Sequence, residues 1–141
     1  MATAGYSGTP LPKKIGLKEG GTMVLVNAPQ GIEAWLVPMP DGAKLTKKLA
    51  AANDLVVLFC KDKAALRKSL PDVSAKLHAD GALWISWPKK ASKLFIDLTE
   101  DGIREIVLPT GLVDVKVCAV NDDWSGLKLM VRKERRAGWN A

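Results

Sequence analysis

The chain has 141 residues, of which 48% are hydrophobic, and a formal net charge of +6. A chain of this length forms one domain that buries roughly two-thirds of its unfolded surface, so its composition excludes wholesale disorder. No apolar stretch approaches the ~18 residues of a membrane helix. The first six residues lack the charged start and apolar region of a signal peptide, so we expect a cytoplasmic protein without a membrane partner.

The positive charge is concentrated near the end of the chain. Residues 132–136 contain four cations and one acid, so they supply three of the six net charges. A short basic segment is typically solvated, and the rest of the chain is only mildly basic, which argues against a nucleic-acid partner. Cys60 and Cys118 both lie in apolar runs. This placement favours buried thiols over a disulfide.

The first part of the chain predicts an arm followed by one strand. Residues 1–22 are rich in glycine, proline, threonine and lysine and show little periodicity. Within them, residues 13–17 predict one helical turn that ends at Gly16. Residues 22–27 predict a first buried strand, which Pro29 breaks.

The middle of the chain predicts a strand and a helix in succession. A short helix is expected near residues 32–36, and residues 43–52 fit either a short strand plus a helix or a single helix. Residues 54–60 predict a strand, because β-branched and aromatic residues occupy their centre. Asp62 is placed to cap the helix that follows. Pro71 predicts a kink in that helix or a division into two short helices.

Residues 82–87 are six mostly apolar residues after an Asp-Gly turn, and they predict a strand buried on both faces. With the strand and helix before them they form a right-handed parallel βαβ unit. Thr99 predicts the start of a further helix, which the Pro-Thr-Gly run at residues 109–111 ends. Residues 112–120 and 126–132 predict two antiparallel strands.

We therefore predict the α/β class: a Rossmann-like, mostly parallel sheet flanked by helices and ending in an antiparallel C-terminal hairpin. In this prediction the domain occupies residues 23–133. The N-terminal arm is residues 1–22, and residues 134–141 form a basic tail.

Two resemblances follow from this pattern. Parallel strands with a C-terminal antiparallel hairpin resemble the sheet of class I methyltransferases. Three motifs look closer still to a family of small bacterial proteins that share a domain of unknown function: Ala-Gly-Tyr-Ser-Gly-Thr-Pro-Leu at 4–11, Trp-Ile-Ser-Trp-Pro-Lys at 84–89 and Gly-Leu-Val-Asp-Val-Lys-Val-Cys-Ala at 111–119. The second resemblance implies a fold and leaves the mechanism open.

The turn after the first strand departs from the methyltransferase pattern. A cofactor loop needs glycines so that the backbone can approach its ligand, but residues 27–31 contain one glycine, at their end, and Pro29. A ribose-binding acid is expected to end the second strand. Asp41 comes too early and residues 44–48 are basic. We therefore predict no cofactor, neither S-adenosylmethionine nor a dinucleotide.

The common catalytic patterns are missing from the sequence. His78 is the single histidine, placed near the expected end of a helix. No Cys-x-x-Cys or His-x-x-x-His pair supports a metal site, and the glycines of residues 16–22 lack the Gly-Lys-Ser/Thr end of a phosphate loop. No Gly-x-Ser-x-Gly elbow occurs. The sequence does not support conventional catalysis. This argues against enzymatic activity.

Polar and aromatic residues follow the ends of the predicted parallel strands, where open α/β sheets bind ligands. The candidates at this edge are Asn27, Lys61, Trp87, Lys89 and Lys90. Tyr6 and Ser7 belong to a loop that can fold over them. In the simplest interpretation Trp87 covers the sheet edge and the lysines are solvated. In the functional one the lysines hold an anion and Trp87 is a stacking wall.

The function predicted from these residues is a non-catalytic binding or interaction module. Its expected partner is an anionic small molecule or an acidic protein. The alternative is a divergent methyltransferase-like transferase that accepts an anionic small molecule at the strand edge of residues 87–90. A saturable response to a small ligand favours the enzyme-like alternative, and capture of one protein partner favours the module.

Overall fold

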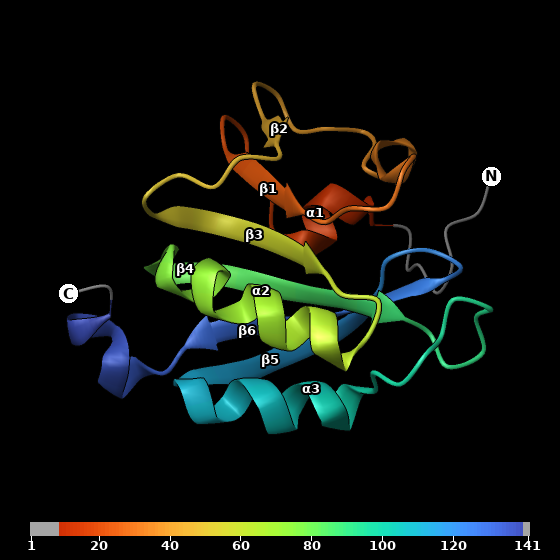
Figure 1. Ribbon diagram of the computed structural model, residues 1–141. Helices are drawn as coiled ribbons and strands as arrows, with labels where there is room; N and C mark the ends of the chain where they lie inside the picture. Colours follow the sequence, from red (N-terminus) through yellow and green to blue (C-terminus); the bar gives the residue numbers. More distant parts are fainter. Residues whose placement is uncertain (1–8, 140–141) are drawn as a thin grey trace.

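A computed structural model describes residues 9–139 and arranges them around one six-stranded sheet (Figure 1). The strands are β1 (Thr22–Val26), β2 (Lys44–Thr46), β3 (Asn53–Phe59), β4 (Leu77–Pro88), β5 (Leu112–Ala119) and β6 (Trp124–Val131). The helices are α1 (Leu11–Ile15), η1 (Ile32–Trp35), α2 (Lys63–Ala75), α3 (Glu100–Val107), η2 (Leu108–Thr110) and η3 (Lys133–Gly138). None of the helices within these residues is long and apolar enough to cross a bilayer.

The sheet order is β2-β1-β3-β4-β6-β5. The pairs β1–β2, β1–β3 and β3–β4 are parallel, whereas β4–β6 and β5–β6 are antiparallel. The predicted α/β class, with its parallel centre and C-terminal antiparallel strands at one side, is confirmed. The parallel centre is buried on both faces because β3 and the second half of β4 are almost continuously apolar.

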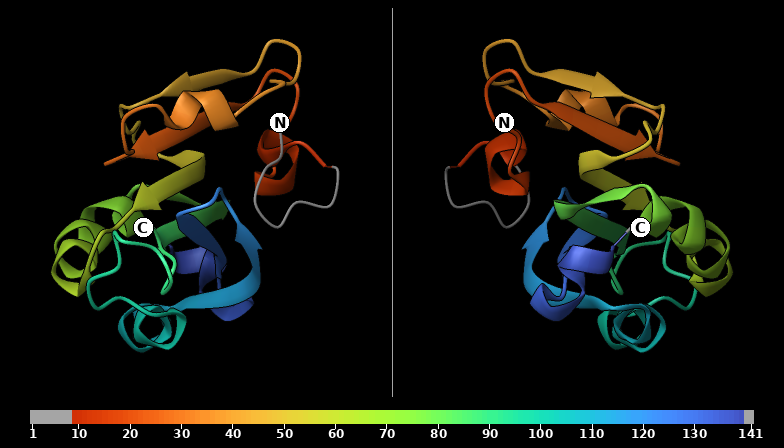
Figure 2. Two further views of the ribbon diagram at one scale, coloured as in Figure 1. Left: turned by 90° about the vertical axis from the view of Figure 1, so that its right-hand side faces the viewer. Right: turned by 90° about the vertical axis from the view of Figure 1, so that its left-hand side faces the viewer.

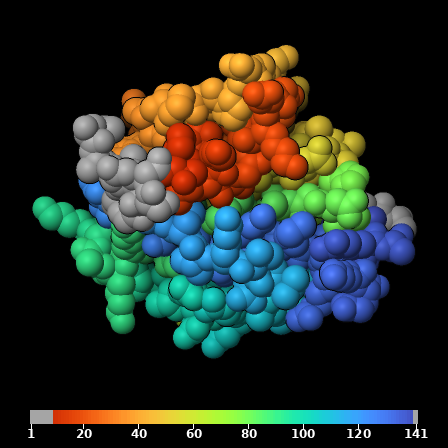
Figure 3. Space-filling view, turned by 180° about the vertical axis from the view of Figure 1, so that it is seen from behind, coloured from red at the N-terminus to blue at the C-terminus, as the bar shows by residue number. Residues whose placement is uncertain are grey.

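Two layers of helices cover the sheet. The front layer is α2 and α3, and the back layer is α1 with η1 (Figure 2). Trp84 and Trp87 are three positions apart on β4, so they face opposite layers. Trp84 lies in the back layer, where its Nε1 donates a hydrogen bond of 2.8 Å to the carbonyl oxygen of Ile15. Figure 3 shows α1, in red, on this back face.

Helix α2 forms where predicted but is not interrupted. Asp62 caps it by accepting a hydrogen bond of 2.8 Å from the backbone N–H of Ala65. Of the two alternatives predicted at Pro71, the division into two short helices is wrong, because a single helix runs through Pro71 to Ala75. Proline removes one backbone donor near the end of the helix, and apolar residues on both sides of it, Leu70 and Val73, remain buried against the sheet.

In two other segments the structure decides between the predicted alternatives or differs from the prediction. Residues 43–52 contain the short strand β2 and then turns, with no helix. Strand β4 begins at Leu77, earlier than predicted, because Asn53 pairs with Leu77 before an irregularity in the β3–β4 register. His78 consequently belongs to a strand, at the amino end of β4, rather than to a helix end.

Residues near both ends of the described chain pack against the sheet. Leu11, Ile15 and Leu17 are buried in the back layer, although they fall in the predicted arm. Trp139, in the predicted basic tail, packs on the front layer and donates a hydrogen bond of 3.1 Å from Nε1 to the carbonyl oxygen of Leu77. Residues of both the predicted arm and the predicted tail therefore contact the core of the domain.

Candidate functional site

A cavity of about 730 Å³ lies at the carboxyl edge of the parallel strands, which the left view of Figure 2 faces. After β1 the chain passes to the back layer through η1, and after β3 it passes to the front layer through α2. Strands that part in this way form a topological switch point, where open α/β sheets bind ligands. This switch-point cavity is lined by Asn27, Pro29, Phe59, Lys61, Ala65, Lys68, Ser69, Pro88, Leu94, Ile96 and Trp124.

A hydrogen-bonded pair forms part of the polar side of the cavity. Asn27 follows β1 directly and has a positive φ of 57°, a left-handed conformation that asparagine tolerates better than most residues. Its Nδ2 donates a hydrogen bond of 3.3 Å to Oγ of Ser69 on α2. Within the described residues, the Ser69 hydroxyl proton and the Asn27 Oδ1 have no other partner. Both groups therefore remain available to a bound molecule.

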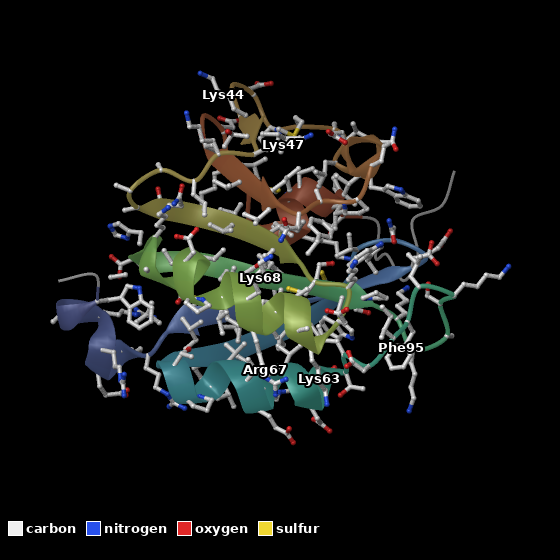
Figure 4. The ribbon with its side chains drawn as sticks, viewed as in Figure 1. Lys44, Lys47, Lys63, Arg67, Lys68 and Phe95 are labelled. Atoms are coloured by element: carbon white, nitrogen blue, oxygen red, sulfur yellow. The ribbon has the colours of Figure 1, made fainter. Side chains whose placement is uncertain are left out.

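Two cations complete the polar side. Lys61 lies two residues after the end of β3, and Lys68 lies on α2, on the front of the molecule in Figure 4. Neither ammonium group lies within ion-pair distance of an acid in the described part of the chain. The described lining also contains no acidic side chain. The positive charge of the two lysines is therefore not offset by an acid within the described lining.

The remaining walls are apolar. Phe59 and Trp124 meet edge to face, with ring centroids 5.4 Å apart. Leu94 and Ile96, on the loop between β4 and α3, are 48% and 56% exposed although they line the cavity. Exposed aliphatic side chains at the mouth of a cavity are typical of surfaces that a ligand covers.

A second cavity of about 530 Å³ contains the other predicted candidates, Trp87, Lys89 and Lys90. Trp87 is 6% exposed, close to the 8% of Trp124 in the switch-point cavity. Phe95, labelled in Figure 4, also lines this cavity. Glu100 and Asp101 lie in its wall and offset the positive charge of the lysines. The attraction for an anion is therefore weaker here than in the switch-point cavity.

The predicted site residues thus separate into two groups. Asn27 and Lys61 line the switch-point cavity, while Trp87, Lys89 and Lys90 line the second one. Tyr6 and Ser7 lie outside the described residues.

Sequence reasoning missed Lys68, Ser69, Leu94, Ile96 and Trp124. Lys68 and Ser69 had a usable signal, because they stand three and four positions after Ala65 and so share its face of the predicted helix. Leu94 and Ile96 had none, since no periodicity relates this loop to the strands, and Trp124 lies at the start of β6, far along the chain from the other lining residues.

Groups that commonly perform catalysis are buried or distant. Burial, with a smaller contribution from Asp62, raises the pKa of Cys60 to about 12, so this thiol stays protonated at neutral pH. His78 lies at the amino end of β4, whereas the cavity contacts Pro88 at the carboxyl end. Residues 9–139 contain no group of three histidine, cysteine or acidic side chains placed to hold a metal ion.

Residues 39–133 match the family described as protein of unknown function (DUF3052). This span covers more than half of the chain and includes two of the three motifs noted in the sequence. The chain belongs to this family. A search of curated proteins found no match to the DUF3052 chain.

Solved methyltransferases share the fold of the DUF3052 protein. A SAM dependent methyltransferase from Aquifex aeolicus is 15% identical, with 85% of this chain and 87% of that chain covered and a TM-score of 0.59. A TehB-like SAM-dependent methyltransferase from Corynebacterium glutamicum is 12% identical, with 86% and 85% covered and a TM-score of 0.55. The glycopeptide N-methyltransferase MtfA, complexed with sinefungin, is 11% identical, with 93% and 88% covered and a TM-score of 0.55. At these identities the likeness shows the fold alone, and the methyltransferase-like architecture predicted from the sequence is confirmed.

The turn after β1 leads to a first testable prediction. Its one glycine, Gly31, has a positive φ of 85°, while Pro29 lines the cavity without a backbone donor. The exposed residues Lys47 and Lys48 follow β2, at the position where the ribose of a cofactor would need an acidic side chain. Calorimetry with S-adenosylmethionine or nicotinamide dinucleotides should therefore detect no binding at sub-millimolar concentration. A micromolar dissociation constant, about −8 kcal/mol, requires a well-formed pocket and would contradict this expectation.

Proposed function

We propose that the DUF3052 protein is a non-catalytic binding module that holds a small anionic molecule in the switch-point cavity. The observation that carries this proposal is the composition of the cavity wall. It combines two lysines without acidic partners, an amide–hydroxyl pair and apolar side chains, all at the edge where open α/β sheets bind ligands.

The wall chemistry favours binding over reaction. Lys61 and Lys68 act as point charges that attract a phosphate or carboxylate, and the Ser69 hydroxyl supplies a directed hydrogen bond. Nucleophilic or acid–base chemistry needs a group whose pKa is matched to its task. The described lining offers no carboxylate, imidazole or thiol for that role.

The test begins with a thermal-shift screen of phosphorylated metabolites, nucleotides and aromatic carboxylates. A saturable rise in melting temperature identifies a ligand for the native protein. Replacing Lys61 and Lys68 together by alanine should then weaken its binding at least tenfold, since a hydrogen bond to a charged group contributes about 1.5–3 kcal/mol. Binding to the wild type should also weaken as salt screens the two lysines.

The Lys89→Ala/Lys90→Ala pair is the matched control. It removes the same charge from the second cavity, and both double variants should change the free energy of unfolding by less than about 0.5 kcal/mol per site. If the control loses binding while the Lys61→Ala/Lys68→Ala protein keeps it, the ligand binds at Trp87 instead. A flat screen beside capture of one acidic protein would contradict a small-molecule ligand.

A second candidate function is a divergent methyltransferase-like transferase that accepts an anionic small molecule at the edge formed by Trp87, Lys89 and Lys90. Two observations favour it: these residues line a cavity, and the structural neighbours are methyltransferases. Methyl transfer from labelled S-adenosylmethionine to an acceptor, abolished by the Lys89→Ala/Lys90→Ala change, would support it. The absence of cofactor binding would exclude it.

A further inference from the structure

A smaller cavity of about 290 Å³ lies beside the switch-point cavity. Pro29, Leu94 and Trp124 line both, so the two cavities adjoin at the carboxyl edge of the sheet and are together called the groove. The smaller cavity is completed by Gln30, Gly31, Ile32, Trp35, Asn121, Asp122 and Asp123. The lining of this smaller cavity comes mainly from η1 and from the loop that joins β5 to β6.

The two ends of the groove carry opposite charge. Lys61 and Lys68 stand at one end with no acid in the described lining. Asp122 and Asp123 stand at the other end, where they also line a neighbouring cavity together with Lys89 and Lys93. Asp123 Oδ1 already accepts a hydrogen bond of 2.9 Å from the Ser92 hydroxyl. The exposed carboxylate of Asp122 has no partner among residues 9–139. Asp122 is therefore the acid that remains available at this end.

The middle of the groove is apolar. Trp124 forms its shared wall, and Leu94, nearly half exposed, lies over both cavities. An apolar segment of a ligand placed here removes the Leu94 side chain from water. The contribution of this segment to the binding free energy grows with each methylene that is buried.

We infer that the ligand is bipolar. This inference rests on the proposed function and extends it. The anionic group of the ligand lies near Lys61 and Lys68, an apolar segment crosses Trp124 and Leu94, and a cationic amino group lies near Asp122. A molecule with both charges matches the whole groove, whereas a simple anion matches one end of it.

The probes are linear ω-amino carboxylates, from γ-aminobutyrate to ω-aminododecanoate, and the same series with the amine acetylated. Acetylation keeps the carboxylate and the alkyl chain but removes the positive charge. Calorimetry or ligand-observed NMR measures the dissociation constants at low salt. The free amines should bind about two- to fivefold more tightly than their acetylated forms at one preferred chain length, as expected for an exposed charge pair.

Asp122→Asn is the decisive variant, and Asp54→Asn is its matched control. Asp54 is an exposed acid at the amino end of β3, at the opposite end of the sheet from the groove. The Asp122→Asn protein should bind the two series equally while its affinity for the acetylated series stays unchanged. Asp54→Asn should preserve the preference for the amine.

Each outcome separates this inference from the proposed function. Equal binding of both series by the wild type, weakened by Lys61→Ala/Lys68→Ala, overturns the bipolar ligand and leaves the anion site intact. A preference for the amine that survives Asp122→Asn also overturns it. Failure of every probe to bind at millimolar concentration overturns the bipolar ligand alone, because the phosphate and aryl carboxylate screen tests the anion site independently.

Discussion

Replacing Trp84 by alanine should lower the free energy of unfolding by about 3–5 kcal/mol, the usual range for removal of a large buried aromatic side chain. Trp84 is 1% exposed, and its indole contacts the back layer of the fold. The substitution also leaves the Ile15 carbonyl oxygen without the hydrogen bond that joins β4 to α1. Urea unfolding followed by circular dichroism measures the loss.

Two further substitutions separate the contribution of packing from that of the hydrogen bond. Trp84→Phe keeps most of the packing and removes the indole donor, so it should lose about 1–3 kcal/mol. Trp35→Ala removes the same kind of side chain from a half-buried position and should lose less than Trp84→Ala. If Trp84→Ala and Trp35→Ala prove equally stable, the packing described for the back layer is wrong.

Replacing Gly81 by alanine should destabilise the fold by about 1–3 kcal/mol through overpacking. A Cβ atom at this position would lie 2.8 Å from the carbonyl oxygen of Asn53, 3.0 Å from that of Asp54 and 3.1 Å from that of His78. All three neighbours are backbone atoms, so relief requires the β3–β4 pairing itself to shift. The same unfolding measurement detects the change.

Gly138→Ala is the matched control for Gly81→Ala. A Cβ atom at Gly138 meets no atom within 4 Å, and its φ is not positive. The control should therefore leave the free energy of unfolding almost unchanged. Equal stability of the two variants would show that β3 and β4 do not approach each other as closely as described.

The helices and strands that could be predicted depend on residues close to one another in the sequence. The parallel strands are apolar runs, and the caps at Asp62 and Thr99 use side chains that accept backbone hydrogen bonds, at 2.8 Å from Ala65 and 3.0 Å from Gly102. The three-residue strand β2 had no such cause. It forms because β1, distant in sequence, offers a free edge to pair with.

The candidate site was predictable only in part, for a related reason. Asn27 and Lys61 follow from the rule that ligands gather at the carboxyl ends of parallel strands. The same rule placed Trp87 beside them, but the side chain of Trp87 belongs to the buried front layer and lines the second cavity. Strand ends can be located in a sequence more readily than the face that each side chain occupies.

The strand order also determines when the sheet can be completed during synthesis. Strand β6 lies between β4 and β5, so the last strand of the chain is the neighbour that covers the open edge of β4. A nascent chain that has emerged only as far as β5 exposes this apolar edge to other strands, a condition that favours aggregation. The chain must therefore have emerged from the ribosome as far as Val131 before β4 can pair with β6.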